Sequence, residues 1–237
     1  MSDSVRSSIK GSPIAVALDA PDVATAARWA GEVAPHVSTL KLGLEFYLAA
    51  GAAGVRQVRA AAPECRLFLD LKLHDIPNTV AGACQAVAGL EPDFLTVHAL
   101  GGPAMVQAAA DSLPEARVTA VTILTSMSEL DLAAVGLSGT PLDAVLRLAE
   151  MAVTSGARAL VCSPQEVAAV RAAVGADVVL VTPGVRPTGA VLGDQQRVAT
   201  PQQALADGAD LLVVGRPITG ARDPAAAAAE LLRDVTI

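Results

Sequence analysis

The chain has 237 residues and a formal net charge of −7, with 52% hydrophobic and 17% charged residues. This composition excludes an intrinsically disordered chain and suits a globular protein with a large core. Because the chain has no basic run and only 2% aromatic residues, it also lacks the usual features of nucleic-acid-binding and anionic-membrane-binding proteins. We therefore expect a small-molecule partner, with no nucleic acid and no membrane.

The cysteines and the amino terminus indicate the compartment. Cys65, Cys84 and Cys162 are odd in number and have no metal-ligand spacing, which favours reduced structural thiols. The chain begins with a polar leader, and no apolar run approaches the roughly 20 residues that a membrane span requires. We expect neither a signal peptide nor a membrane anchor, and hence a cytoplasmic protein.

Short apolar runs alternate with segments of helical spacing along the chain. In chain order, the expected strands cover residues 13–19, 38–41, 67–73, 94–98, 117–124, 159–162, 178–182 and 211–214. The expected helices cover about residues 23–34, 44–62, 79–90, 105–113 and 142–155, with further helices starting at Pro164 and near residue 223. Long loops are expected at residues 125–141 and 189–200, the second without any apolar period.

Strands that alternate with helices in this way predict a parallel sheet with helical crossovers, either closed as a barrel or open and doubly wound. Charged or polar residues follow the carboxyl end of nearly every expected strand. Barrels place their sites at these ends, whereas an open sheet concentrates them at one switch point. We therefore predict an α/β fold, with a single (β/α)₈ TIM-barrel domain over residues 1–237 that includes the short polar leader.

The segment from Leu67 to Thr79 places charged residues where an apolar strand should be buried. Since strand side chains alternate between faces, Asp70 and Lys72 share one face and point together into the interior. Buried charges are costly unless they compensate each other, so the pair indicates a functional site. The alternative is a structural ion pair at a strand end, with Asp75 or Asn78 capping the next helix.

The first two strands also end in charged residues. Asp19 ends the first strand and Lys41 the second, so a barrel would bring both beside Asp70 and Lys72 at one mouth. Taken singly, each could be a solvated charge. Four charges of alternating sign on three consecutive strands indicate a site.

The last two strands end in residues suited to phosphate. Arg186 follows the strand at residues 178–182, and Gly215 and Arg216 follow the strand at residues 211–214, where such barrels commonly bind phosphate. Glycine lets backbone N–H groups approach an oxyanion, and arginine offers a planar fork of donors. A turn glycine beside a solvated arginine is the alternative.

The run Asp-Leu-Lys-Leu-His-Asp-Ile-Pro-Asn-Thr, residues 70–79, closely resembles the signature of the orotidine 5′-phosphate decarboxylase family. The Leu18-Asp19 pair, Lys41, residues 183–186 and the Gly215-Arg216 pair occur in the family's order, so the resemblance covers nearly the whole chain. It implies conversion of orotidine 5′-phosphate to uridine 5′-phosphate in de novo pyrimidine biosynthesis. It also implies that the reaction needs no metal and no cofactor.

The resemblance implies a role for each matched residue. Lys72 would be the cation and proton donor to C6 of the pyrimidine, with Asp70, Asp75 and Lys41 completing the catalytic set. Asp19 and Lys41 would bind the ribose hydroxyls. The substrate-binding residues that it implies are Asp19, Lys41, Asp70, Asp75, Ile76, Thr79, Thr125, Pro183, Arg186, Gln195, Gly215 and Arg216.

Asp75 lies three residues after Lys72, on a segment that must leave the barrel. We therefore expect that Asp75 cannot reach the site of its own chain. The resemblance implies a homodimer in which Asp75, Ile76 and Thr79 enter the neighbouring subunit's site, and the neighbour reciprocates across a two-fold axis.

Two other functions stay open. A related barrel decarboxylase that acts on a keto-sugar phosphate shares the Asp-x-Lys-x-x-Asp core and would use a divalent metal, although residues 74–79 favour the pyrimidine enzyme. A noncatalytic protein that binds nucleotide phosphates is the second, and the intact Asp70 and Lys72 argue against it. For His74 and His98 we expect structural roles, because no other residue with metal-ligand spacing accompanies them.

Overall fold

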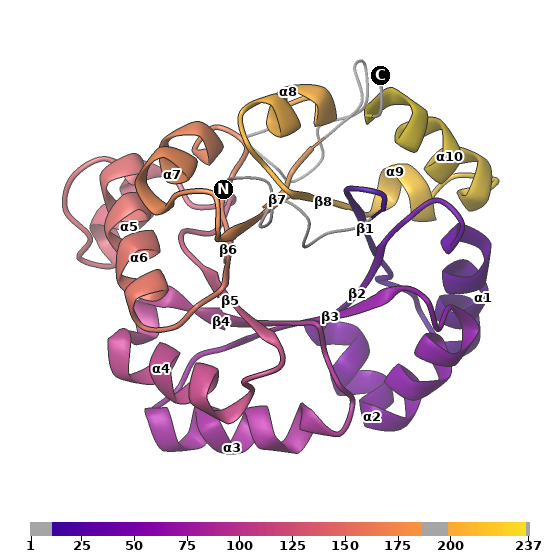
Figure 1. Cartoon of the computed structure of the whole chain (residues 1–237), viewed down its shortest axis with the longest axis horizontal. Helices are drawn as coiled ribbons and strands as arrows, with labels where there is room; N and C mark the ends of the chain where they lie inside the picture. Colours follow the sequence, from indigo (N-terminus) through magenta and orange to yellow (C-terminus); the bar gives the residue numbers. More distant parts are fainter. Residues whose placement is uncertain (1–10, 186–198, 236–237) are drawn as a thin grey trace, which may run out of the picture.

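Eight parallel strands close into a barrel in which each strand pairs with the next and β8 pairs with β1 (Figure 1). The computed structural model describes residues 11–185 and 199–235. The strands are β1 (Ile14–Ala17), β2 (Thr39–Gly43), β3 (Arg66–Leu73), β4 (Phe94–His98), β5 (Arg117–Val121), β6 (Ala159–Val161), β7 (Val179–Pro183) and β8 (Leu211–Val214). The predicted (β/α)₈ barrel is confirmed.

Helices form the outer layer around the barrel (Figure 1). They are α1 (Val23–Val33), α2 (Leu44–Ala61), α3 (Pro77–Ala88), the short 3₁₀ turn η2 (Ala99–Gly101), α4 (Pro103–Ser112), α5 (Glu129–Ala134), α6 (Pro141–Thr154), α7 (Val167–Val174), α8 (Pro201–Ala206), α9 (Arg216–Thr219) and α10 (Pro224–Val235). Among the described residues, no helix is both long and apolar enough to cross a membrane.

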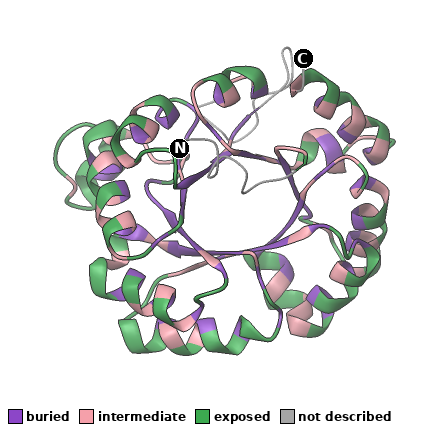
Figure 2. Ribbon diagram, in the orientation of Figure 1, coloured by how far each residue is buried: buried purple, intermediate pink, exposed green. Residues whose placement is uncertain are grey.

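Most strand residues are buried (Figure 2). Their side chains alternate between the barrel interior and the helical layer, so both faces of the sheet are covered. Leu67, Leu69 and Leu71 of β3 belong to the large cluster between strands and helices. Phe68 belongs instead to a smaller cluster inside the barrel, where its ring lies 5.6 Å from that of Phe94. The side chains of β3 therefore pack into two separate cores. Those on its inward face lie inside the barrel, below the mouth at the carboxyl-terminal ends of the strands.

The amino-terminal end of the barrel is held by two aspartates that each precede a strand. Asp93 accepts a hydrogen bond from the backbone N–H of Leu67 at 2.8 Å, and Asp210 accepts one from that of Leu180 at 2.8 Å. Arg171 pairs with the Asp210 carboxylate at 2.5 Å. These contacts tie neighbouring strands together at the end opposite the mouth, which is where barrels carry stabilising interactions.

Four helices begin at other residues than predicted. The helix expected from Pro164 begins later, at Val167. The helices expected from residues 79, 105 and 142 begin earlier, at a proline in the first turn. Proline is favoured there because the backbone N–H groups of the first turn have no partner within the helix, so a residue without an N–H loses no hydrogen bond. The expected loop at residues 125–141 contains α5, which starts with a capping box between Ser128 and Asp131.

Three further differences concern the mouth. The fifth strand ends at Val121 instead of residue 124, and the Thr122 hydroxyl then donates to the carbonyl of Val161. Two short helices, α8 and α9, were not predicted, since they span six and four residues and show no helical period. The leader and residues 186–198, which include most of the expected second loop, lie outside the described residues.

Replacing Leu180 by alanine tests the core between strands and helices. Leu180 is fully buried in β7, so Leu180→Ala should lower the free energy of unfolding by about 2–5 kcal/mol through lost burial and a cavity. Urea unfolding curves of wild type and of each variant, all at the same protein concentration, measure the change. Leu130→Ala is the control, because the Leu130 side chain is 82% exposed and its loss should change the value by less than about 0.5 kcal/mol. Equal effects of the two substitutions would contradict this assignment of the core.

Candidate active site

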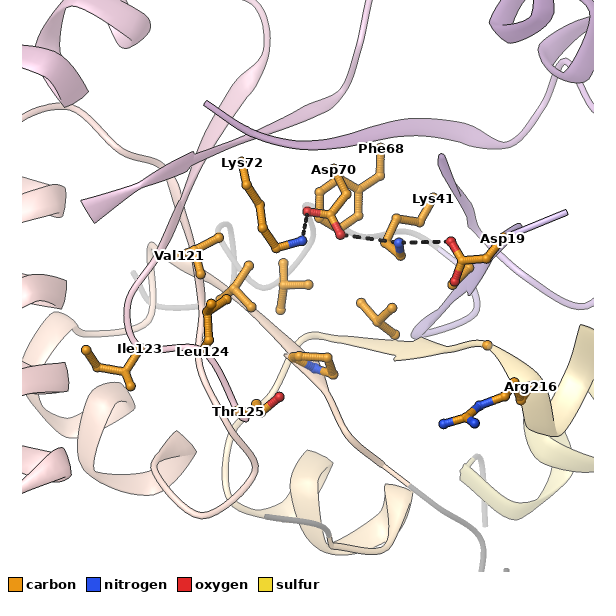
Figure 3. Close-up of a pocket in the computed structure, with 16 residues that line it drawn as sticks. Asp19, Lys41, Phe68, Asp70, Lys72, Val121, Ile123, Leu124, Thr125 and Arg216 are labelled. Atoms are coloured by element: carbon orange, nitrogen blue, oxygen red, sulfur yellow. Dashed lines mark hydrogen bonds and ion pairs between the residues drawn. The ribbon is translucent and has the colours of Figure 1, made fainter. Parts of the chain in front are cut away.

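A cavity of about 580 Å³ opens at the carboxyl-terminal mouth of the barrel (Figure 3). Every strand except β4 contributes a residue to its walls. The predicted site residues that line it are Asp19, Lys41, Asp70, Lys72, Thr125, Pro183, Gly215 and Arg216. The structure thus brings together residues that lie almost 200 positions apart in the sequence, which supports one shared site.

Four of these residues form a chain of alternating charges. The Lys72 ammonium lies 2.7 Å from Asp70 Oδ1, and the Lys41 ammonium lies 3.2 Å from Asp70 Oδ2 (Figure 3). Lys41 also lies 3.8 Å from Asp19 Oδ1 at the rim. The side chains of Lys41 and Asp70 are only 11% and 14% exposed, so each compensates the other's loss of hydration.

The Asp70 carboxyl is held in its ionised form. Burial by itself raises the pKa of this group, but the charges of Lys41 and Lys72 and hydrogen bonds from Lys72 and Thr96 oppose burial and leave the pKa below its ordinary value. Asp70 therefore stays negatively charged at neutral pH and holds both ammonium groups beside the cavity.

The backbone of β3 departs from a regular strand at this point. Lys72 has φ of +50°, a left-handed conformation that costs a non-glycine residue about 1–3 kcal/mol. The pairing of β3 with β4 also shifts between Leu69 and Leu73. Even so, Asp70 and Lys72 share the inward face with Phe68, so the alternation read from the sequence is confirmed.

Thr96 is a residue of this network that the sequence reasoning missed. It is fully buried in β4, and its hydroxyl donates to Asp70 Oδ1 at 3.0 Å. The Thr96 hydroxyl oxygen also accepts a hydrogen bond from the backbone N–H of Lys72 at 2.8 Å. A signal was present, because alternation puts Thr96 on the same face as Phe94 and makes it a polar residue inside an apolar strand.

The remaining walls of the cavity are apolar below and polar at the rim. Phe68, Val161 and Val181 line the interior side. Thr125 and Arg216 lie across the cavity from Asp70 (Figure 3). The cavity can therefore hold a small molecule that has an apolar part and separate polar groups.

Three predicted residues lie away from this cavity. Asp75, Ile76 and Thr79 are exposed at the start of α3, and none of them lines the site of its own chain. The carboxylate of Asp75 accepts the N–H of Ile76 at 2.6 Å. The alternative that Asp75 or Asn78 caps α3 is wrong, because Ile76 is the N-cap and no side chain bonds there. Arg186 and Gln195 lie outside the described residues.

The two histidines lie beside the network. Their ring centroids are 5.5 Å apart, with His74 at the surface and His98 at the end of β4. Burial lowers the pKa of His98, and the neighbouring His74 and Lys72 lower it further. Within residues 11–185 and 199–235, no cluster of three or more His, Cys, Asp or Glu side chains could hold a metal ion.

The lowered pKa of Asp70 makes stability depend on pH. A free aspartate side chain has a pKa of about 3.9, so the stability that ionised Asp70 contributes is complete above that value and is lost as pH falls through the lower pKa of the folded protein. The free energy of unfolding of wild type relative to Asp70→Asn should fall in this acid range. Urea titrations from about pH 8 to about pH 2.5 measure it. The difference should stay flat from pH 6 to pH 8, and a difference that is constant over the whole range would contradict the lowered pKa.

Comparisons with known proteins agree with this geometry. A family model described as the orotidine 5′-phosphate decarboxylase / HUMPS family matches residues 12–231. The orotidine 5′-phosphate decarboxylase of Thermobifida fusca is 68% identical over 223 residues, which cover 94% of this chain and 95% of that protein. The protein of the same name from Frankia casuarinae is 55% identical over 234 residues, which cover 91% of this chain and 85% of that protein.

Solved structures show the same fold. The crystal structure of orotidine 5′-phosphate decarboxylase from Lactobacillus acidophilus superimposes with a TM-score of 0.83 at 36% identity, over 96% of this chain and 100% of that chain. An uncharacterized conserved protein from Geobacillus kaustophilus gives a TM-score of 0.82 at 34% identity, over 94% and 100%. The family model spans the barrel and every described residue of the charge network, and so the chain belongs to the orotidine 5′-phosphate decarboxylase / HUMPS family.

Proposed function

We propose that this protein decarboxylates orotidine 5′-phosphate to uridine 5′-phosphate and carbon dioxide, a step of de novo pyrimidine biosynthesis. The observation that carries the proposal is the chain of charges Asp19, Lys41, Asp70 and Lys72 beside the cavity. Family membership and two relatives named for this reaction support it.

The chemistry needs a cation that can also give up a proton. When the bond between C6 and the carboxylate breaks, its electron pair stays on C6 and carbon dioxide leaves. The Lys72 ammonium would stabilise this charge and then donate its proton to C6. Arginine could not replace it, because a guanidinium does not lose its proton in proteins. The sequence has three lysines, Lys10, Lys41 and Lys72, and two of them lie in this site.

Asp70 has two proposed roles. It orients the Lys72 ammonium through their 2.7 Å contact. Its negative charge would also lie beside the carboxylate of the bound substrate, which raises the free energy of the ground state and is relieved when carbon dioxide leaves. The lowered pKa of Asp70 supports both roles, because each needs the ionised form.

The rest of the substrate fits the remaining walls. Asp19 and Lys41 would bind the ribose hydroxyls at the rim. Thr125 and Pro183 would lie near the pyrimidine. We propose as phosphate ligands Gly215 and Arg216, together with Arg186 and Gln195, which are outside the described residues. Binding energy from this remote phosphate would help to position C6 beside Lys72.

We further propose that a single barrel domain carries this reaction without metal or cofactor, in the cytoplasm. One observation supports the compartment. Cys65, Cys84 and Cys162 are all buried and free, as is usual in a reducing compartment. Burial raises the pKa of Cys65 and of Cys84 to about 11, so both thiols stay protonated and unreactive.

We propose a homodimer with shared sites, in which Asp75, Ile76 and Thr79 of one chain complete the site of the other. All three side chains are exposed in the single chain, and the Ile76 side chain is 65% exposed although it is large and apolar. Leu100, in the 3₁₀ turn η2 after β4, is also apolar and exposed, and Gly101 of the same turn packs beside His74, close to Ile76 in the chain. A second copy on this face would cover Ile76 and Leu100 and deliver Asp75.

An ultraviolet assay with orotidine 5′-phosphate tests the reaction, and Lys72 variants test its mechanism. Wild type should turn over the substrate with and without EDTA, whereas activity that EDTA abolishes would favour the metal-dependent alternative. Lys72→Ala should lower kcat by at least about 100-fold, because it removes both the cation and the proton donor. Lys72→Arg should be similarly impaired, since it keeps the charge and cannot donate.

Arg28→Ala is the matched control for these variants. Arg28 forms a surface pair with Glu32 on α1, so its loss should leave kcat unchanged. Near-normal turnover by Lys72→Ala would refute the role of Lys72. Binding of uridine 5′-phosphate by wild type without any decarboxylation would support a noncatalytic binding protein instead.

Mixing two inactive variants tests the shared site. In a heterodimer of Asp75→Asn and Lys72→Ala chains, both changes fall in one composite site and the other site is wild type. Co-refolding equal amounts should therefore restore about one quarter of wild-type activity, given random pairing of chains. Refolding each variant alone is the control. Heterodimers that are confirmed by mass spectrometry and remain inactive would contradict the arrangement, as would a fully active monomer.

A further inference from the structure

The mouth of the barrel contains one buried hydroxyl that bonds to two residues of the charge network. Thr96 is fully buried in β4, so water cannot take the place of its side chain. Its hydroxyl has one proton, which goes to Asp70 Oδ1, and a lone pair, which accepts the backbone N–H of Lys72. Both contacts reach β3 from the neighbouring strand.

The register shift explains why Lys72 needs this partner. Leu69 pairs with Leu95 and Leu73 pairs with Val97, so the three residues between Leu69 and Leu73 lie opposite Thr96 alone. A regular ladder would give the Lys72 N–H a backbone carbonyl. Here the N–H bonds to the Thr96 hydroxyl at 2.8 Å, while Lys72 keeps its left-handed φ of +50°.

We propose that Thr96 is a positioning residue for the decarboxylation: its hydroxyl fixes the Lys72 backbone and the Asp70 carboxylate relative to each other, so that the ammonium approaches C6 from one direction. This inference rests on the proposed function. Thr96 does not line the cavity, so it acts through Asp70 and Lys72 and not on the substrate. Its loss should therefore affect the chemical step more than binding.

Thr96→Val tests this role, because valine keeps the shape of threonine and removes both hydrogen bonds. Hydrogen bonds to charged groups are strong enough that kcat should fall by about 10- to 100-fold. The Kd of uridine 5′-phosphate should change by less than about 3-fold, since its proposed ligands are untouched. Thr96→Ser restores the hydroxyl and should return kcat to within about 3-fold of wild type.

The pH profile of kcat separates positioning from a general structural effect. The groups that face the Asp70 carboxylate are Lys41 of β2, Lys72 of β3, and Thr96 and His98 of β4, with Asp19 behind Lys41. The Thr96 hydrogen bond helps to lower the pKa of Asp70. Thr96→Val should therefore move the acid limb of the profile to higher pH, and Thr96→Ser should move it back.

Thr119→Val is the matched control. Thr119 is equally buried in the next strand, β5, but its hydroxyl donates to the carbonyl of Arg117 in its own strand. It should leave kcat and the acid limb unchanged. If Thr96→Val does not fold, Thr96→Ser is compared with Thr96→Ala. Both lack the methyl group of threonine, and only the serine variant has a hydroxyl. The kcat of Thr96→Ser should then be at least about 5-fold higher than that of Thr96→Ala.

The outcomes are distinct. Wild-type enzyme without turnover of orotidine 5′-phosphate would overturn the proposed function and this role together. Active wild type with a folded Thr96→Val variant of unchanged kcat would overturn the role of Thr96 alone. So would a serine variant as impaired as the valine variant, or a parallel loss of kcat and of affinity for uridine 5′-phosphate.

Discussion

The Asp70 carboxylate between two lysine ammonium groups is the interaction on which the site depends. Carboxylate and ammonium groups lose hydration at this depth, and each offsets part of the other's loss. With Lys41 at 3.2 Å and Lys72 at 2.7 Å, the three groups compensate one another, and the pKa of Asp70 falls despite burial. A site that handles a developing negative charge benefits from this arrangement, because its charges are in place before the reaction begins.

The barrel makes this arrangement possible by giving one strand two environments. The outward side chains of β3 anchor it against the helices, while its inward side chains change from apolar Phe68 to charged Asp70 and Lys72 near the mouth. The amino-terminal end is stabilised separately, by Asp93 and Asp210. Stabilising contacts and the charged site therefore occupy opposite ends of the barrel, and the strained backbone of Lys72 lies at the site.

The segment between β3 and α3 is exposed and suits contact with another protein. After Lys72 the chain leaves the barrel, and Asp75 points to solvent beside the apolar Ile76. A carboxylate and a large apolar side chain at one surface suit contact with another protein better than contact with water. The proposed homodimer would use both, and it would add the Asp75 carboxylate of the neighbouring chain to a site whose own chain supplies Asp19 and Asp70.

The sequence by itself determined the barrel and most of the charged site. Alternation of short apolar runs with helical segments predicted the topology, and period-two alternation predicted that Asp70 and Lys72 face inward together, because both properties are local. The family was also readable from residues 70–79, since a contiguous run preserves its spacing. The roles of all the predicted site residues stay predictions. For Asp75 the role concerns a second chain, and Arg186 and Gln195 lie outside the described residues.

Only the tertiary structure decided the contacts that depend on register and on closure. Alternation marks Thr96 as a polar residue on the inward face, but no local pattern shows that three residues of β3 lie opposite it. The contacts of its hydroxyl and the left-handed Lys72 therefore needed the structure. The short helix α5 was missed because its capping box lies in a segment too short for a helical period. Local physics specifies which elements form and which way their side chains point, whereas the distances between charges arise when strands far apart in the chain pair and close the barrel.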